Sequence, residues 1–226
     1  MLLGATSESK KELIGFEVRV RESAQSWREL LVDLKSRGLT IAPEVAVGDG
    51  ALGFWKAVEE IFPGTRHQRC WLHKIVNVLD KVPLSVQPKM KQDLREICLA
   101  PNRAGAEAAL NVFAEKYRVK YGKAVECLTK DRESLLTFYD LPAEHWEHLR
   151  TTNPIESVFA TVRHRTVRTK GSLSSATAKL MVFKLIVAAS KTWRRLNGTN
   201  QLPKVIGGVR FQDGIEVIEA PANRAA

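Results

Sequence analysis

Two acidic residues stand where a carboxylate could hold a divalent metal ion. Asp49 follows the short apolar run 45–47 and lies between two glycines. Side chains at the carboxyl end of such a strand are the usual ligand groups of an α/β sheet. Glu156 lies within Thr151-Thr152-Asn153-Pro154-Ile155-Glu156-Ser157, at the edge of a basic stretch, and a carboxylate usually approaches phosphate through a metal ion. Both residues also have structural interpretations, because Asp-Gly is a common turn pair and Asn153-x-x-Glu156 matches a helix capping box.

The positive charge of the chain is concentrated in one stretch. The net charge is +10, and no acidic residue occurs between Glu156 and Asp213, so the rest of the chain is close to neutral. A concentrated positive field favours a polyanionic partner such as DNA or RNA, with a solvated basic surface as the alternative. The basic residues of this tract are Arg163, Arg165, Arg168, Lys170, Lys179, Lys184, Lys191, Arg194, Arg195, Lys204 and Arg210.

Length and composition exclude several classes of protein. The 226 residues, 44% of them hydrophobic and 27% charged, suffice for a real core. The longest apolar stretch, 180–189, is interrupted by Lys184 and is shorter than the about 20 residues that span a bilayer. No secretory pattern opens the sequence, and three dispersed cysteines make a poor disulfide framework. We therefore expect no membrane association and a reducing, cytoplasmic location.

Apolar patterns predict alternating strands and helices in the first part of the chain. The first twenty residues favour a β-hairpin that turns at 7–10, and the run 45–47 favours a strand. Between Ser23 and Gly38, apolar residues at helical spacing predict one helix, and a second is expected from Leu52 to a stop at Pro63. This alternation is typical of an α/β fold.

Helices are expected to dominate the remainder. From about Lys74 to His148 the pattern predicts helix after helix without a strand. Asn153 is expected to cap a further helix whose buried stripe is Ile155, Val158, Phe159 and Val162. A long helix from about 174 to 196 and a terminal hairpin at Asp213-Gly214 complete the expected elements.

The spacing His67-x-x-Cys70-x-x-His73 contains only residue types that can bind zinc. A closed structural site needs a fourth ligand, whereas Cys98 and Cys127 lie alone in predicted helices. Zinc is therefore not expected. The favoured interpretation is a strand-to-helix junction at which Cys70 and Trp71 pack inward and His73 caps the helix or forms a hydrogen bond.

Three motifs in order give the sequence a family resemblance. The segments 47–50, 62–74 and 151–157, the last followed by Arg163 and Arg165, resemble the mutator-type transposases of bacterial insertion sequences from near Met1 to about Asp213. The resemblance implies an α/β, ribonuclease-H-like fold with a DDE acid triad, interrupted by an all-helical insertion. Asp49 would be the second acid and Glu156 the third, and Cys70 and His73 match the family's Cys-x-x-His motif.

This resemblance implies a division of the chain and a set of partners. The first part of the ribonuclease-H-like core would occupy 1–74, the insertion 75–150, the second part of the core 151–200, and a C-terminal hairpin and tail 201–226. The expected cofactor is a Mg²⁺ pair held by Asp49 and Glu156, with Mn²⁺ as an alternative ion. Transposon ends and target DNA would be bound, the protein would form homo-oligomers, and it would associate with the nucleoid. The residues expected to contact DNA are Arg163, Arg165, Arg168 and Lys170.

The sequence departs from the family pattern at the first acid. No Asp precedes Asp33, which falls in a predicted helix, and Glu8, Glu12, Glu17 and Glu22 have no counterpart in the motif. We therefore expect an N-terminally truncated copy of a DDE-type transposase, without the first strand of the fold and catalytically incomplete by itself. Two alternatives stay open: a non-catalytic DNA-binding or oligomerising remnant that modulates full-length transposase, and a zinc-built DNA reader.

Overall fold

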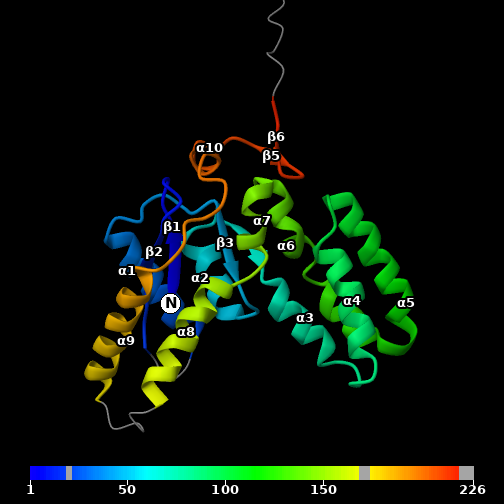
Figure 1. The fold of residues 1–226 in the computed structure, drawn as a ribbon, viewed down its shortest axis with the longest axis horizontal. Coiled ribbons are helices and arrows are strands. Elements are labelled where there is room, and N and C mark those ends of the chain that lie inside the picture. The colour runs from blue at the N-terminus through cyan, green and yellow to red at the C-terminus, as the bar shows by residue number, and fades with distance from the viewer. Residues whose placement is uncertain (19–21, 168–173, 219–226) are drawn as a thin grey trace, which may run out of the picture.

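The computed structural model describes residues 1–18, 22–167 and 174–218. Figure 1 shows α1 to the left of the strands β1 to β3 and the helices α3 to α6 to their right, with α2 overlapping the strands in this view. The helices α8 and α9 flank the strands, and the C-terminal hairpin lies above them. The chain thus combines an α/β part with a helical part, as the sequence patterns predicted.

Strands and helices alternate in the first part of the chain. The hairpin pairs antiparallel with Leu3 opposite Leu13, and the next two strands pair parallel with Val45 opposite Arg66. Parallel pairing requires the crossover helix that the sequence predicted between them. The two ladders form separate two-stranded sheets. The elements are β1 (Leu2–Ala5), β2 (Lys11–Gly15), α1 (Ala24–Ser36), β3 (Val45–Gly48), α2 (Leu52–Ile61) and β4 (Arg66–Arg69).

Local sequence accounts for α1 and its packing. Ser23 Oγ accepts the Ser26 N–H (3.1 Å), and Ser26 Oγ accepts the Ser23 N–H (3.0 Å), which completes a capping box. The helix buries Leu31 and Leu34 against the aromatic face of α2, where Trp55 is also buried. The predicted helical spacing in this region is confirmed.

Helices follow one another from Trp71 to Leu149, as predicted, and share one hydrophobic core. The side chains of Met90, Leu94 and Ile97 are completely buried on one face of α4. The elements are α3 (Trp71–Leu79), α4 (Gln87–Cys98), α5 (Arg103–Thr129), α6 (Arg132–Leu136), the 3₁₀ turns η1 (Thr137–Asp140) and η2 (Ala143–His145), and α7 (Trp146–Leu149).

Buried polar side chains join β4 to these helices. Gln68 is fully buried, and its side chain donates to the Leu135 carbonyl (3.1 Å) and accepts the Phe138 N–H (2.7 Å). The Trp71 indole donates to the same Leu135 carbonyl (2.8 Å). Because every one of these groups would be costly to leave unpaired, the bonds fix where the helical part sits relative to β4.

The last part of the chain departs from the sequence pattern in two helices. The expected helix from 174 to 196 ends at Ser190, because the following segment turns away and the Leu196 N–H donates to the Ser9 carbonyl (2.9 Å). The expected buried stripe of α8 is also wrong in part, since Val158 is buried but Phe159 is half exposed. These elements are α8 (Asn153–Thr166), α9 (Ser175–Ser190), α10 (Leu202–Ile206), β5 (Phe211–Gln212) and β6 (Ile215–Glu216).

The predicted terminal hairpin is confirmed. Asp213 and Gly214 both have positive φ, 48° and 81°, as a two-residue turn of type I′ requires. Asp213 Oδ1 also accepts the Arg103 N–H (2.6 Å), which ties the hairpin to the start of α5.

Within the described ranges, the chain has no helix of the length and apolarity that crossing a membrane demands.

Lys74 provides a test of the link between β4, α3 and the helical core. Its side chain is 1% exposed, donates to the Cys127 carbonyl (2.9 Å) and forms an ion pair with Asp131, which Arg69 also approaches at 3.4 Å. Replacing Lys74 by Met leaves a largely buried carboxylate short of a partner, so we expect a loss of about 3–5 kcal/mol in the free energy of unfolding. Urea denaturation measures it. The exposed control Lys81→Met should change stability by less than about 0.5 kcal/mol, and equal effects of the two substitutions would contradict the assignment.

Candidate active site

Asp49 and Glu156 line one pocket of about 390 Å³. The pocket lies between β1, the end of β3, α1 and the first turns of α3 and α8. Four carboxylates line it, and among the described residues that line it there is no Lys or Arg. The four are Glu17, Glu22, Asp49 and Glu156. Such a wall attracts cations.

Asp49 is held at the carboxyl end of β3. Its Oδ1 accepts the Ala51 N–H (3.0 Å), and its main-chain carbonyl accepts the indole N–H of Trp55 (3.1 Å). The flanking glycines have packing roles. A Cβ on Gly48 would lie 2.9 Å from the Trp55 ring, and one on Gly50 would lie 2.9 Å from the guanidinium of Arg69. Neither position therefore has room for a larger residue without a shift of these side chains.

Glu156 lies in the first turn of α8, but the predicted capping box does not form. The helix begins at Asn153, so its N-cap is Thr152, and that side chain makes no capping hydrogen bond. Instead, Thr152 Oγ1 donates to Glu156 Oε1 (2.8 Å). The hydroxyl therefore orients the carboxylate, which remains 40% exposed.

Glu17 and Glu22 are pocket residues that the sequence analysis did not select. They lie between β2 and α1, in a segment without helical or strand periodicity, so no local signal pointed to them. Glu22 accepts a hydrogen bond from the Trp27 indole. Burial lowers the pKa of the Met1 amino group in the same pocket, and attraction to Glu22 and Glu17 opposes this shift. The pocket is thus more acidic than the sequence motifs alone indicated.

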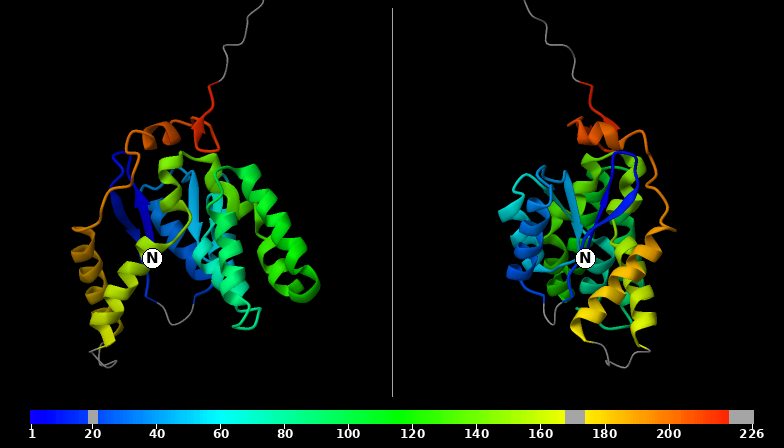
Figure 2. Two further views of the ribbon diagram at one scale, coloured as in Figure 1. Left: turned by 45° about the vertical axis from the view of Figure 1, so that its right-hand side comes forward. Right: turned by 90° about the vertical axis from the view of Figure 1, so that its left-hand side faces the viewer.

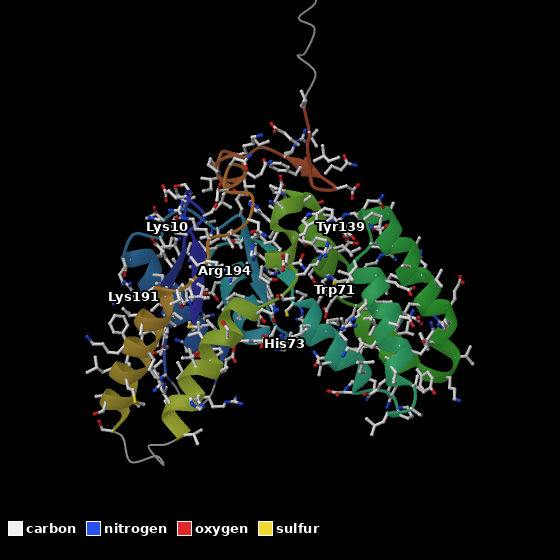
Figure 3. All side chains as sticks on the ribbon, in the orientation of Figure 1. Lys10, Trp71, His73, Tyr139, Lys191 and Arg194 are labelled. Atoms are coloured by element: carbon white, nitrogen blue, oxygen red, sulfur yellow. The ribbon has the colours of Figure 1, made fainter. Side chains whose placement is uncertain are left out.

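Cys70 and His73 occupy the predicted strand-to-helix junction beside Glu156. Cys70 and Trp71 are each 1% exposed, which confirms that they pack inward. His73 Nδ1 lies 3.3 Å from Cys70 Sγ and 3.7 Å from Glu156 Oε1. Figure 3 shows His73 at the start of α3, where α8 passes. Of the groups the structure describes, these three form the one close cluster of possible metal-ligand atoms, and Asp49 is outside it.

The residues expected to contact DNA follow Glu156 along α8. Arg163 and Arg165 are exposed in the last turns of this helix. Arg168 and Lys170 lie outside the described residues. The neighbouring helix α9 runs beside α8 (Figure 2) and adds exposed Lys179 and Lys184. Basic side chains are therefore carried by two adjacent helices next to the acidic pocket.

Comparison with known proteins identifies the family to which the chain belongs. The model of the family "Transposase, Mutator family" matches residues 1–195, and the chain belongs to this family. It is 50% identical over 223 residues to the transposase for insertion sequence element IST2 of Acidithiobacillus ferrooxidans, which covers 99% of this chain and 74% of that relative. It is 48% identical to the transposase for insertion sequence element IS6120 of Mycolicibacterium smegmatis, over 99% of this chain and 68% of the relative.

The packing around Gly48 gives a test of how Asp49 is positioned. The Gly48→Ala methyl group would collide with Phe54 and Trp55. We expect a loss of about 1–3 kcal/mol in the free energy of unfolding. Gly64→Ala is the control, because a Cβ there meets nothing within 4 Å. Thermal or urea unfolding compares the two, and a Gly48→Ala protein as stable as Gly64→Ala would contradict this packing.

Proposed function

We propose that the chain contributes to the metal-dependent phosphodiester cleavage and strand transfer of DNA transposition. Asp49 and Glu156 act as the metal ligands, and the basic face of α8 and α9 binds DNA. The observation that carries the proposal is that two acids separated by the whole helical part line one acidic pocket. Membership of the Mutator transposase family supports it.

The pocket fits a hard divalent ion. Mg²⁺ and Mn²⁺ prefer carboxylate oxygens and keep positions open for water and phosphate. Bound there, a metal pair would activate a water or a 3′-hydroxyl and stabilise the leaving oxygen of an in-line displacement at phosphorus. Hydrogen bonds within the chain orient both carboxylates: the Ala51 N–H donates to Asp49, and the Thr152 hydroxyl donates to Glu156.

The charge distribution along α8 suits DNA. The helix starts with Glu156 in the pocket and ends with Arg163 and Arg165, two turns further on. Arg163 lies on the same side of the helix as Glu156, whereas Arg165 is turned away from it by about half a turn. A DNA strand whose phosphate contacts Arg163 would run toward the metal ligands. The proposal includes the ribonuclease-H-like division at 74, 150 and 200, in which the β1–β2 and β3–β4 ladders both fall in the first part of the core.

The family's first acid has no match by motif in this chain. Two matched carboxylates leave a metal pair short of ligands and mutually repelling. We therefore expect the chain alone to bind metal and DNA without cutting DNA. Mg²⁺-dependent nicking of element-end DNA by the purified chain, abolished by Glu156→Gln, would contradict this expectation and would point to Glu17 or Glu22 as a further ligand.

Metal binding tests the two ligands. Titration with Mn²⁺, followed by electron paramagnetic resonance of the free ion, should show affinity that falls about tenfold or more in Asp49→Asn and in Glu156→Gln, because each variant lacks a charged oxygen ligand. Glu115→Gln, on the exposed face of α5, is the matched control and should bind Mn²⁺ like the unaltered chain. Unchanged affinity in both pocket variants would exclude this pocket as the metal site.

DNA binding tests the basic face. Fluorescence anisotropy with duplex DNA over a range of salt concentrations should show a steep log-log dependence, with a slope of about −0.9 for each phosphate neutralised. Replacing Arg163 and Arg165 together by Gln should make the slope shallower by about 2. Arg118→Gln on the exposed face of α5 should leave it unchanged. An equal change of slope in the Arg163 and Arg165 double variant and in Arg118→Gln would mean that DNA does not follow α8.

The non-catalytic alternative is distinguished by combining these measurements. A DNA-binding or oligomerising remnant would bind DNA with the same salt dependence, but Asp49→Asn and Glu156→Gln would have no effect on Mn²⁺ affinity. The proposed function requires both the salt-dependent binding of DNA and the loss of Mn²⁺ affinity in the two variants.

A further inference from the structure

The strand-to-helix junction brings together a set of ligand atoms with a chemistry different from that of the carboxylate pocket. Cys70 ends β4, His73 lies in the first turn of α3, and Glu156 comes from the first turn of α8. One ligand atom from each of the three lies within 4.8 Å of the other two. We did not expect zinc from the sequence, because it shows no further ligand near Cys70 and His73. Glu156 follows the helical part in the sequence, and the fold brings it next to Cys70 and His73.

Two of the separations between these atoms equal those of ligand atoms around a tetrahedral ion, and the third, between Cys70 Sγ and Glu156 Oε1, is at most 4.8 Å. Bonds of about 2.0–2.3 Å place the ligand atoms of such an ion about 3.3–3.8 Å apart. Cys70 Sγ lies 3.3 Å from His73 Nδ1, which lies 3.7 Å from Glu156 Oε1. Thr152 Oγ1 lies beside all three, 3.5 Å from Sγ and 3.4 Å from Nδ1, and donates a hydrogen bond to Oε1 (2.8 Å).

The sulfur of Cys70 is held in place by the start of two helices, α3 and α8. Sγ accepts the main-chain N–H of Thr152 (3.4 Å), and Cys70 is the N-cap residue of α3, at the positive end of the helix. The junction is also fixed from several sides: the Cys70 N–H donates to the Gly48 carbonyl (2.7 Å), and the Trp71 N–H donates to the Arg150 carbonyl (2.8 Å). The ligand set is therefore pre-organised by the backbone.

An ion can reach this cluster from the acidic pocket. Cys70 is buried, but His73 and Glu156 are each 40% exposed in their side chains. Both line the pocket together with Thr152. The acidic wall would draw cations toward the cluster.

We propose that Cys70, His73 and Glu156 form a binding site for one thiophilic divalent ion, of the type of Zn²⁺. A sulfur, an imidazole nitrogen and a carboxylate oxygen suit Zn²⁺ or Co²⁺, whereas Mg²⁺ takes oxygen ligands. The site shares Glu156 with the proposed carboxylate pair, but it needs Cys70 and does not need Asp49. It holds whether or not the chain takes part in DNA cleavage.

Cobalt is the probe that reports both the ligand type and the geometry. Co²⁺ titrated into the full chain should bind with one equivalent, giving a thiolate-to-cobalt charge-transfer band and the strong visible bands of tetrahedral coordination, and Zn²⁺ should displace it. Cys70→Ser should remove the charge-transfer band, and His73→Gln should weaken Co²⁺ binding about tenfold or more. His73 is partly exposed, so this second variant keeps the test decisive if Cys70→Ser fails to fold.

The controls separate this site from the other cysteines and from the carboxylate pair. Cys98→Ser should keep the band, since Cys98 lies outside the cluster of ligand atoms. Cys127→Ser should also keep it. Asp49→Asn should bind Co²⁺ normally while losing Mn²⁺ affinity, so failure of one site is distinguishable from failure of the other. Absence of the charge-transfer band, its persistence in Cys70→Ser, or unchanged affinity in His73→Gln would overturn the proposal.

Discussion

The arrangement of the candidate site depends on the backbone hydrogen bonds that converge at Cys70. The Cys70 N–H donates to the Gly48 carbonyl, immediately before Asp49, and the next residue, Trp71, donates to the carbonyl of Arg150. Thr152 then donates to the Cys70 sulfur. These bonds join the end of β3, the start of α3 and the start of α8, so the two acids on either side of the helical part come to one pocket.

A second constraint is the separation of charge around the pocket. Its walls carry carboxylates, while the helices beside it carry exposed lysines and arginines. A polyanion attracted to the helices would be repelled by the walls unless a cation intervened. The carboxylates of the pocket and the basic side chains of α8 and α9 lie close together. This favours an arrangement in which a metal ion lies between the carboxylates and a bound nucleic acid. The buried pair of Lys74 and Asp131 belongs to a different category, because it anchors α3 in the helical core and takes no part in the surface field.

The sequence was sufficient where structure follows from local pattern. Periodicity predicted α1 and α2, and the turn residues Asp213 and Gly214 predicted the last hairpin. Prediction from the sequence was wrong where contacts between residues far apart in the chain determine the structure. Residues past Ser190 leave the helix because Leu196 pairs with the distant Ser9, and the Thr152 hydroxyl turns to Glu156 instead of capping α8. The motif resemblance correctly placed Asp49 and Glu156 in one pocket. It gave no hint of Glu17 and Glu22, nor that Glu156 would approach Cys70 and His73, because such proximity arises only from the tertiary fold.

The central claim is that the carboxylates of Asp49 and Glu156 face a common metal-binding space. The most direct measurement is the anomalous diffraction of crystals of this chain soaked in Mn²⁺. Manganese peaks inside the pocket, at bonding distance from oxygens of both residues, are the predicted result. Peaks that occur only elsewhere on the molecule, or a pocket in which the two carboxylates point away from each other with no manganese between or beside them, would contradict the account.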